Sequence, residues 1–280
     1  MAKKALLIGI NHYQVPGANL RGCVNDVTNL KRALVQFAGF TEANTKTLLD
    51  LRATKAAMQT GMQNLIKGAK KGDVLVLHYS GHGSNVPDKN GDEADHRDEI
   101  LCPTNLDWAD PLLDDWLRVT FDKLPAGVSF TVIMDCCFSG TCTRAIEPPD
   151  APSIERYLPN PLDLLATESR RGLSGKVRST LVPGHRAERG KQDVVVADIG
   201  EVLITGCRDT QTSADAYIAG TYNGALTYHL VKAIQEKKGK LTYRELHQRT
   251  LDLLSKGKYD QVPQLEGRAA NLDRPIFAAV

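Results

Sequence analysis

Two kinds of hydrophobic pattern alternate along the chain. Short apolar runs predict buried strands, and longer segments with apolar residues every three to four positions predict amphipathic helices. The strands are expected over 4–10, 45–49, 73–79, 128–134, 201–206 and 275–280, and the helices over 23–37, 54–69, 119–124, 225–235 and 243–254. Strands that alternate with helices indicate βαβ units, so we expect an α/β fold with a mostly parallel central sheet flanked by helices.

Residues 147–193 break this pattern. The stretch contains several prolines, and its Arg and Lys residues concentrate between 170 and 191. It predicts a long exposed loop, and loops of this length in compact domains are usually functional or disordered. We therefore expect one domain composed of a large segment, 1–146, a basic, proline-containing linker, 147–193, and a small segment, 194–280.

Composition excludes several classes of protein. Hydrophobic residues make up 42% and charged residues 24% of the 280 residues, and the net charge is +2. These values are ordinary for a globular protein, and no apolar run approaches the roughly 20 residues that span a bilayer. We expect neither a nucleic-acid nor a membrane partner. The apolar run 5–10 is too short for a signal peptide, and the six cysteines form no C-x-x-C pair. The sequence predicts a cytoplasmic monomer with reduced thiols.

Two predicted strands end in residues suited to nucleophilic catalysis. The strand over 128–134 leads into Asp-Cys-Cys-Phe-Ser-Gly, and the strand over 73–79 leads into Ser-Gly-His-Gly. Parallel strands bring their carboxyl ends to one edge of a sheet, where such folds bind ligands. A cysteine there can attack a peptide carbonyl with a histidine as base. These residues do not by themselves choose between Cys136 and Cys137, and a buried structural cysteine is the competing interpretation.

Five sequence blocks, in order, give the chain a family resemblance. They are Leu20–Asp26, Tyr79–Gly83, Gly91–Asp95, Asp135–Gly140 and Gly206–Asp215. With them the chain resembles the metacaspases, the Arg/Lys-specific branch of the caspase-like cysteine peptidases. The resemblance implies a caspase-like (caspase-hemoglobinase) sandwich, of the prokaryotic metacaspase or orthocaspase type without a prodomain. His82 also precedes Cys137 by close to the roughly 50 residues typical of caspases.

The resemblance implies roles for the residues at both strand ends. The family's nucleophile is the second cysteine of the pair, which is Cys137, and its general base is His82. The backbone amides of Gly83 and Cys137 would form the oxyanion hole. Because neighbouring side chains of an extended chain point to opposite sides, Cys136 would pack away from the site.

The resemblance also implies a pocket for the residue before the cut bond. Its lining would be Cys23, Asp26, Ser80 and Asp135. Two carboxylates in one pocket attract a guanidinium and accept its forked hydrogen bonds. Caspases carry basic groups at this place and accept aspartate instead. Taken alone, Asp26 has a simpler explanation as a favourable charge in the first turn of a helix.

A calcium site is expected within the acidic tract 88–115. Dense carboxylates suit calcium, although Glu93 stands where an EF-hand loop requires glycine. The resemblance implies calcium ligands at Asp98, Asp114 and Asp115, whereas the family's fourth position is occupied by Arg144. A solvated acidic loop is the alternative interpretation.

The basic part of the linker predicts self-cleavage. Its candidate sites are Arg170, Arg171, Lys176, Arg178, Arg186, Arg189 and Lys191. An exposed loop can be drawn extended into an active site. The alternative is a solvated linker, and the absence of interleaved aromatic residues argues against a nucleic-acid patch.

Together, these features predict a hydrolase. We expect a calcium-responsive, self-processing thiol protease, made as a zymogen, that cleaves protein or peptide substrates after Arg or Lys. The alternatives are a caspase-fold pseudoenzyme that serves as a regulatory interaction module, and a caspase-like peptidase with non-basic specificity.

Overall fold

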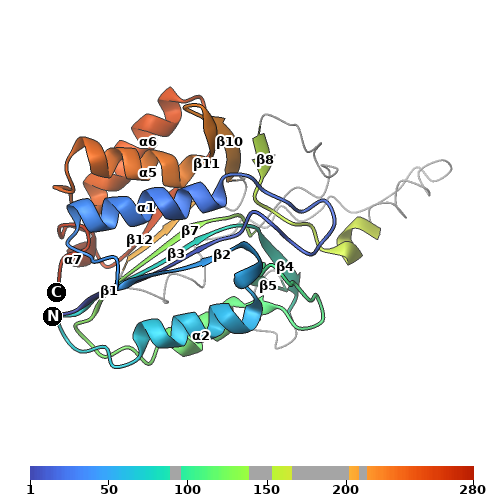
Figure 1. Ribbon diagram of the computed structural model, residues 1–280, viewed down its shortest axis with the longest axis horizontal. Coiled ribbons are helices and arrows are strands. Elements are labelled where there is room, and N and C mark those ends of the chain that lie inside the picture. The colour runs from blue at the N-terminus through green and yellow to red at the C-terminus, as the bar shows by residue number, and fades with distance from the viewer. Residues whose placement is uncertain (89–95, 139–152, 166–201, 208–212) are drawn as a thin grey trace.

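A six-stranded sheet forms the centre of the computed structural model, which describes residues 1–88, 96–138, 153–165, 202–207 and 213–280 (Figure 1). The strand order is β12-β9-β7-β3-β1-β2. All neighbours are parallel except β12, which runs antiparallel to β9. The strands are β1 (Lys3–Gly9), β2 (Thr45–Leu49), β3 (Val74–Ser80), β7 (Ser129–Asp135), β9 (Val202–Thr205) and β12 (Gln264–Gly267). The predicted α/β class with a mostly parallel sheet is confirmed.

Helices cover both faces of this sheet (Figure 1). One face carries α1 (Cys23–Phe37), α5 (Ala225–Glu236) and α6 (Tyr243–Lys256), and the other carries α2 (Lys55–Ile66) and α3 (Asp114–Phe121). Two short elements, η1 (Asp50–Arg52) and α7 (Ala269–Leu272), and the residues 161–165 are also helical. The helix α1 has the bounds that its periodicity predicts. The Thr54 hydroxyl caps α2 by accepting the Ala57 N–H at 3.3 Å.

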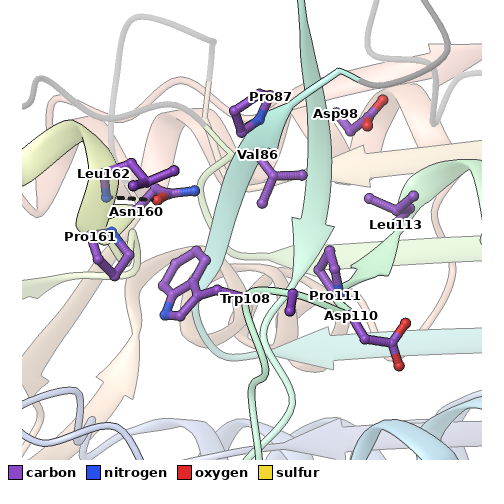
Figure 2. Close-up of a pocket in the computed structure, with 11 residues that line it drawn as sticks. Val86, Pro87, Asp98, Trp108, Asp110, Pro111, Leu113, Asn160, Pro161 and Leu162 are labelled. Carbon is purple, nitrogen blue, oxygen red and sulfur yellow. Dashed lines mark hydrogen bonds between the residues drawn. The ribbon is translucent and has the colours of Figure 1, made fainter.

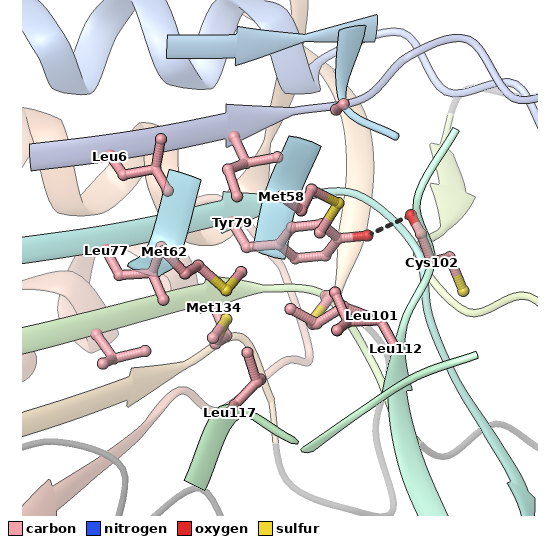
Figure 3. Close-up of a cluster of buried hydrophobic side chains, with 14 of the residues drawn as sticks. Leu6, Met58, Met62, Leu77, Tyr79, Leu101, Cys102, Leu112, Leu117 and Met134 are labelled. Atoms are coloured by element: carbon pink, nitrogen blue, oxygen red, sulfur yellow. Dashed lines mark hydrogen bonds between the residues drawn. The ribbon is translucent and has the colours of Figure 1, made fainter. Parts of the chain in front are cut away.

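Side chains of the central strands alternate between two hydrophobic clusters. In β1, Leu6 and Ile8 pack with α2 and α3, whereas Ala5 and Leu7 pack with α1 and α5. Figure 3 shows the first cluster, in which Met62 lies beside Leu77 and Met58 beside Tyr79. Fully burying one such side chain contributes about 1.5–3 kcal/mol. This alternation explains why both layers of helices are held by one sheet.

Two small sheets lie beyond the carboxyl ends of the central strands (Figure 1). One has the order β4-β5-β6 and the other β11-β10-β8. Their strands are β4 (Gly83–Pro87), β5 (Arg97–Leu101), β6 (Leu112–Leu113), β8 (Ser153–Glu155), β10 (Ala214–Ile218) and β11 (Thr221–Gly224). They enclose the edge of the central sheet where β3 and β7 end.

Three expectations about individual elements are wrong. No strand covers 275–280, where an isolated bridge joins Pro275 to Thr242; the strand beside β9 is β12 instead. The short helix expected over 119–124 begins earlier, at Asp114, and ends at Phe121. Within the linker 147–193, the described part is not an exposed loop, since it contains β8 and a fully buried Arg156.

None of the helices in the described part of the chain combines the length and the apolar character needed to cross a lipid bilayer.

Candidate active site

Cys137 and His82 lie at the ends of neighbouring parallel strands. Ser80, the last residue of β3, pairs with Asp135, the last residue of β7. His82 and Cys137 each follow two residues later, and their exposed fractions are only 3% and 1%. The topology therefore brings an imidazole and a thiol to the same edge of the sheet.

The surroundings of His82 keep its imidazole neutral. Its Nε2 lies 2.8 Å from the Ala18 carbonyl oxygen, which can only accept, so we assign the ring proton to Nε2. The other nitrogen, Nδ1, is buried and has no hydrogen-bond partner among the described residues. Burial lowers the pKa of His82 to about 4, because a charged imidazole is poorly solvated there. At neutral pH the ring is uncharged and Nδ1 can take up a proton.

Cys137 is held as a buried thiol. Its Sγ accepts the Ser213 backbone N–H and lies 3.5 Å from the Cys207 Sγ. Burial, together with Cys207, raises the pKa of Cys137, so the thiol must release its proton to a base before it attacks. The structure shows no hydrogen bond between this sulfur and His82 within the described residues, and such contacts are often long before a substrate is engaged. Cys136 packs instead into the first hydrophobic cluster.

The carboxylates of the expected specificity pocket surround an arginine of the same chain. The guanidinium of Arg156 contacts Asp26 through Nη2 at 2.8 Å and Asp135 through Nη1 at 3.2 Å. Its Nη1 also donates to the Ser80 hydroxyl at 2.8 Å. Cys23 is fully buried at the start of α1, and its electrostatic interaction with Arg156 places it near this group. The four residues implied by the resemblance are thus gathered around one cation.

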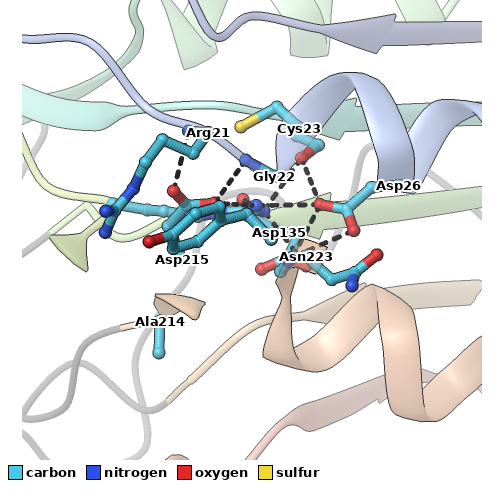
Figure 4. A network of polar contacts seen from close by, with 12 residues as sticks. Arg21, Gly22, Cys23, Asp26, Asp135, Ala214, Asp215 and Asn223 are labelled. Atoms are coloured by element: carbon cyan, nitrogen blue, oxygen red, sulfur yellow. Dashed lines mark hydrogen bonds and ion pairs between the residues drawn. The ribbon is translucent and has the colours of Figure 1, made fainter. Parts of the chain in front are cut away.

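A third carboxylate, Asp215, completes the pocket. It lies 3.1 Å from Nη2 of Arg156 and accepts the backbone N–H groups of Arg21 and Gly22, both at 2.8 Å. Figure 4 shows Asp26 on α1, Asp135 at the end of β7 and Asp215 on β10 converging from three elements. The residue Arg156 and all three of these aspartates have an exposed fraction of 0%. An alkylguanidinium therefore fits this place both in shape and in charge.

Glycine at position 224 permits this close packing. The Gly224 N–H donates to Asp26 at 2.9 Å, and a Cβ at this position would lie only 2.6 Å from the same carboxylate. The main chain of β11 therefore packs directly against the pocket, and only glycine leaves room for this contact.

The pocket holds one cation among three carboxylates. Burial raises the pKa of Asp26 to about 7, although Arg156 opposes this shift. Burial would also raise the pKa of Asp135, but Arg156 and hydrogen bonds from Ser213 and Thr227 hold it below its usual value. Burial disfavours the charged guanidinium, whereas the surrounding carboxylates raise the pKa of Arg156 further. Arg156 is therefore charged, and each carboxylate depends on it.

The backbone of Arg156 occupies the expected oxyanion hole. Its carbonyl oxygen accepts the N–H of Gly83 at 3.0 Å and the N–H of Cys137 at 3.2 Å. Two amides aimed at one carbonyl oxygen stabilise the negative charge that develops there during acyl transfer. Only glycine fits at position 83, because an added Cβ would lie 2.8 Å from the carbonyl carbon of Cys137.

The expected calcium ligands lie in β5 and α3. Asp98 in β5 and Asp114 at the start of α3 are buried, and Asp115 forms an ion pair with Arg118. The described residues contain no group of three or more His, Cys, Asp or Glu side chains that could hold a metal ion. Arg144 lies outside the described residues. Calcium binding stays a prediction.

The expected self-cleavage sites between 170 and 191 also lie outside the described residues.

Sequence reasoning missed three residues of the site. Asp215 and Cys207 belong to the block Gly206–Asp215, which signalled that this segment matters but not what it contacts. For Arg156, a single arginine after Ser-Ile-Glu in a proline-containing stretch, the sequence carries no comparable signal.

Comparisons with known proteins agree with this geometry. The family model described as "Metacaspase, peptidase C14 domain" matches residues 3–145. Metacaspase-1 of Yarrowia lipolytica is 35% identical over 288 residues, covering 94% of this chain and 61% of that protein. Metacaspase-1A of Aspergillus oryzae is 36% identical over 290 residues, covering 94% of this chain and 67% of that protein. The crystal structure of protein GSU0716 from Geobacter sulfurreducens has a TM-score of 0.69 and 27% identity, covering 100% of both chains.

Proposed function

Because this chain belongs to the metacaspases of peptidase family C14, we propose that it is a cysteine endopeptidase that cleaves proteins after Arg or Lys. The observation that carries the specificity is the guanidinium of Arg156 between Asp26, Asp135 and Asp215. A buried cation is retained only where carboxylates and hydrogen-bond acceptors replace its water. The chain's own arginine thus supports a basic residue as the natural occupant of this pocket.

The reaction follows from the groups beside the bound carbonyl. The Cys137 thiol gives its proton to Nδ1 of His82, and the resulting thiolate attacks the carbonyl carbon of the substrate's basic residue. The negative charge that forms on the oxygen is held by the Gly83 and Cys137 amides. His82 then returns the proton to the leaving amine as the C–N bond breaks. Water, deprotonated by His82, hydrolyses the thioester and regenerates the thiol.

Specificity is tested with four fluorogenic peptides, Ser-Ile-Glu-Xaa, in which Xaa is Arg, Lys, Gln or Asp. Losing a charged partner of buried carboxylates costs about 3–5 kcal/mol, so we expect the Gln and Asp peptides to be cleaved at least about 100-fold more slowly than the Arg peptide. Comparable rates for the Arg and Asp peptides would contradict the proposal. Cleavage of none of the peptides would leave the pseudoenzyme as the better interpretation.

Two variants test whether kcat/KM depends on the carboxylates of the pocket and not on acidic residues of the surface in general. Asp215→Asn is expected to lower kcat/KM for the Arg peptide by about 100-fold, because one carboxylate of the pocket is lost. The matched control is Asp273→Asn, since Asp273 pairs with Arg244 at 2.7 Å on the opposite, exposed side of the fold. This control is expected to leave kcat/KM unchanged.

Calcium activation is a further part of the proposal. The support is the density of carboxylates in the acidic tract 88–115, because carboxylate oxygens are the ligands that suit calcium. Calcium at millimolar concentration is therefore expected to raise peptidase activity.

A further inference from the structure

A second thiol lies beside the nucleophile, at the end of a strand on the other side from the one that leads to His82. The strand β7 lies between β3 and β9 and runs parallel to both. Met134 of β7 pairs with Thr205 of β9, and Cys207 follows Thr205 by two residues. Because β9 ends at the same edge of the sheet as β7, the sulfur atoms of Cys207 and Cys137 lie only 3.5 Å apart.

Polar contacts hold the chain around Cys207 in this position. The buried Gln261 side chain donates to the Gly206 carbonyl at 2.9 Å and accepts the first backbone N–H of β10 at 3.1 Å. A Cβ at Gly206 would lie 2.5 Å from the Ser213 hydroxyl oxygen, so only glycine permits this close approach. Ser213 in turn donates its N–H to the Cys137 sulfur. The same packing therefore positions both thiols.

Rotation of the two side chains is enough to join their sulfur atoms. A disulfide bond is about 2.05 Å long, so the two atoms must approach by roughly 1.5 Å. Neighbouring strands of a sheet lie about 4.8 Å apart, which is within the Cα separation of about 4.4–6.8 Å that disulfides span. Cys137 and Cys207 follow directly on two such strands. Their backbones therefore suit a disulfide as they stand.

Cys207 is the sulfur that a small oxidant reaches first. It is half-buried, whereas Cys137 is 1% exposed. A cavity of about 680 Å³ beside β4 is lined by Val86, Trp108 and Pro161 among others, and none of the described residues that line it is a cysteine (Figure 2). That cavity does not open onto either sulfur. Access to the thiol pair therefore depends on the exposed part of Cys207, since oxidation of a thiol follows its exposure.

We propose that Cys137 and Cys207 form a peroxide-sensitive thiol pair, in which Cys207 is oxidised first and then forms a disulfide with the nucleophile. A hydroperoxide converts the Cys207 thiol into a sulfenic acid and is itself reduced to water or an alcohol. The Cys137 sulfur then attacks the Cys207 sulfur, so that the S–S bond forms and the S–O bond breaks. The leaving hydroxyl takes the Cys137 thiol proton and departs as water. Two thiols thus give two electrons to one hydroperoxide.

The disulfide stops peptide cleavage reversibly. It removes the thiol that attacks the substrate, and this consequence, unlike the disulfide itself, rests on the proposed function. A dithiol such as dithiothreitol restores both thiols by exchange and is itself oxidised. A sulfenic acid without a partner thiol is instead oxidised further to a sulfinic acid, which thiols do not reduce. Cys207 therefore protects the nucleophile from permanent loss.

The test is peptide mapping of the reduced wild-type chain after exposure to hydrogen peroxide. Remaining thiols are blocked with iodoacetamide, and the chain is digested with chymotrypsin in the absence of reductant. A cut after Phe138 separates Cys142 from the pair Cys136 and Cys137. We expect the peptide that contains Cys207 to be joined to the peptide that ends at Phe138, with fragment masses that assign the bond to Cys137. Dithiothreitol is expected to separate the two peptides and to restore peptidase activity.

Two matched variants identify the partners. Cys136→Ala is expected to keep the joined peptide, because Cys136 packs into the first hydrophobic cluster. Cys207→Ser is expected to lose it, and peroxide should inactivate this variant at least about tenfold more slowly than the wild type, because the remaining thiol is buried. The activity that Cys207→Ser loses is not recovered with dithiothreitol. A bond from Cys207 to another cysteine, or inactivation of Cys207→Ser at the wild-type rate, overturns the proposal.

Mapping of the wild type does not depend on the folding of any variant. If the reduced chain cleaves no Arg or Lys peptide but peroxide joins Cys137 to Cys207, the proposed function fails and the thiol pair stands. If the reduced chain cleaves Arg peptides but peroxide does not join Cys137 to Cys207, the thiol pair fails and the proposed function stands.

Discussion

The guanidinium of Arg156 is the shared partner of three buried carboxylates, so its removal tests the pocket directly. The substitution Arg156→Gln is made in a Cys137→Ala background, which cannot cut itself. It removes ion pairs of 2.8, 3.1 and 3.2 Å. Removing one partner of a buried ion pair costs about 3–5 kcal/mol. We therefore expect the free energy of unfolding to fall by at least about 3 kcal/mol at pH 8.

The loss of unfolding free energy is expected to grow with pH, because the substitution changes the pKa of Asp135. With Arg156 present, the pKa of Asp135 lies below its usual value. Without the guanidinium, burial and the neighbouring Asp26 raise that pKa above the value of about 3.9 in the unfolded chain. A carboxyl with a raised folded-state pKa binds its proton more tightly when folded, so stability decreases as the pH rises between the two values. The penalty of Arg156→Gln thus grows as the pH rises from 5.5, by at most about 1.4 kcal/mol per pH unit for one carboxyl.

Urea unfolding at pH 5.5, 7 and 8 measures this penalty through the transition midpoint. The control is Arg244→Gln in the same background, because Arg244 forms a half-exposed pair with Asp273; such pairs contribute less than about 1 kcal/mol. Agmatine, an alkylguanidinium, is expected to restore part of the stability of the Arg156→Gln chain, since a ligand of the folded state stabilises it. Unchanged stability at pH 8, or a loss that does not vary with pH, would refute this role of the guanidinium.

Four further outcomes are expected. Gly83→Ala lowers kcat by at least about 100-fold, because the oxyanion donor is displaced; a folded variant with normal kcat would show that this amide is dispensable. Cys137→Ala abolishes peptide cleavage and Cys136→Ala preserves it, which titration of the reactive thiol with a labelled iodoacetamide would verify; the reverse result exchanges their roles. Self-cleavage keeps its rate from pH 7 down to pH 5.5, because the pKa of His82 is about 4, whereas an ordinary imidazole would be only about one-tenth neutral at pH 5.5; a tenfold loss over this range contradicts the assignment. Millimolar calcium, added after chelation, raises activity through the tract 88–115; a flat titration leaves this tract a solvated loop.

The hydrophobic pattern alone determined the central layers of the fold. Thr45–Leu49 forms a strand and Cys23–Phe37 a helix with the bounds that the sequence predicts. Their signals are local, because a period of two or of 3.6 residues is set by neighbours in the chain. The same pattern places His82 and Cys137 after parallel strands, and the direction of such strands is enough to bring both to one edge. Resemblance in five blocks then identified the family before any contact was known.

Pairing between distant segments decided the rest. The strands β8 and β12 are short, and each is a strand only because a partner far along the chain offers its backbone groups. The expected strand 275–280 has no such partner among the described residues, where its β pairing is limited to the isolated bridge between Pro275 and Thr242.

The same distinction applies to the candidate site. Asp215 reaches Arg156 across 59 residues of sequence, and Asp26 reaches it across 130. No local pattern encodes separations of that size. The sequence identifies an acidic pocket, a thiol and an imidazole through their family blocks. Only the tertiary structure places the chain's own arginine in that pocket with its carbonyl in the oxyanion hole, because that placement depends on the register of β8 against β10.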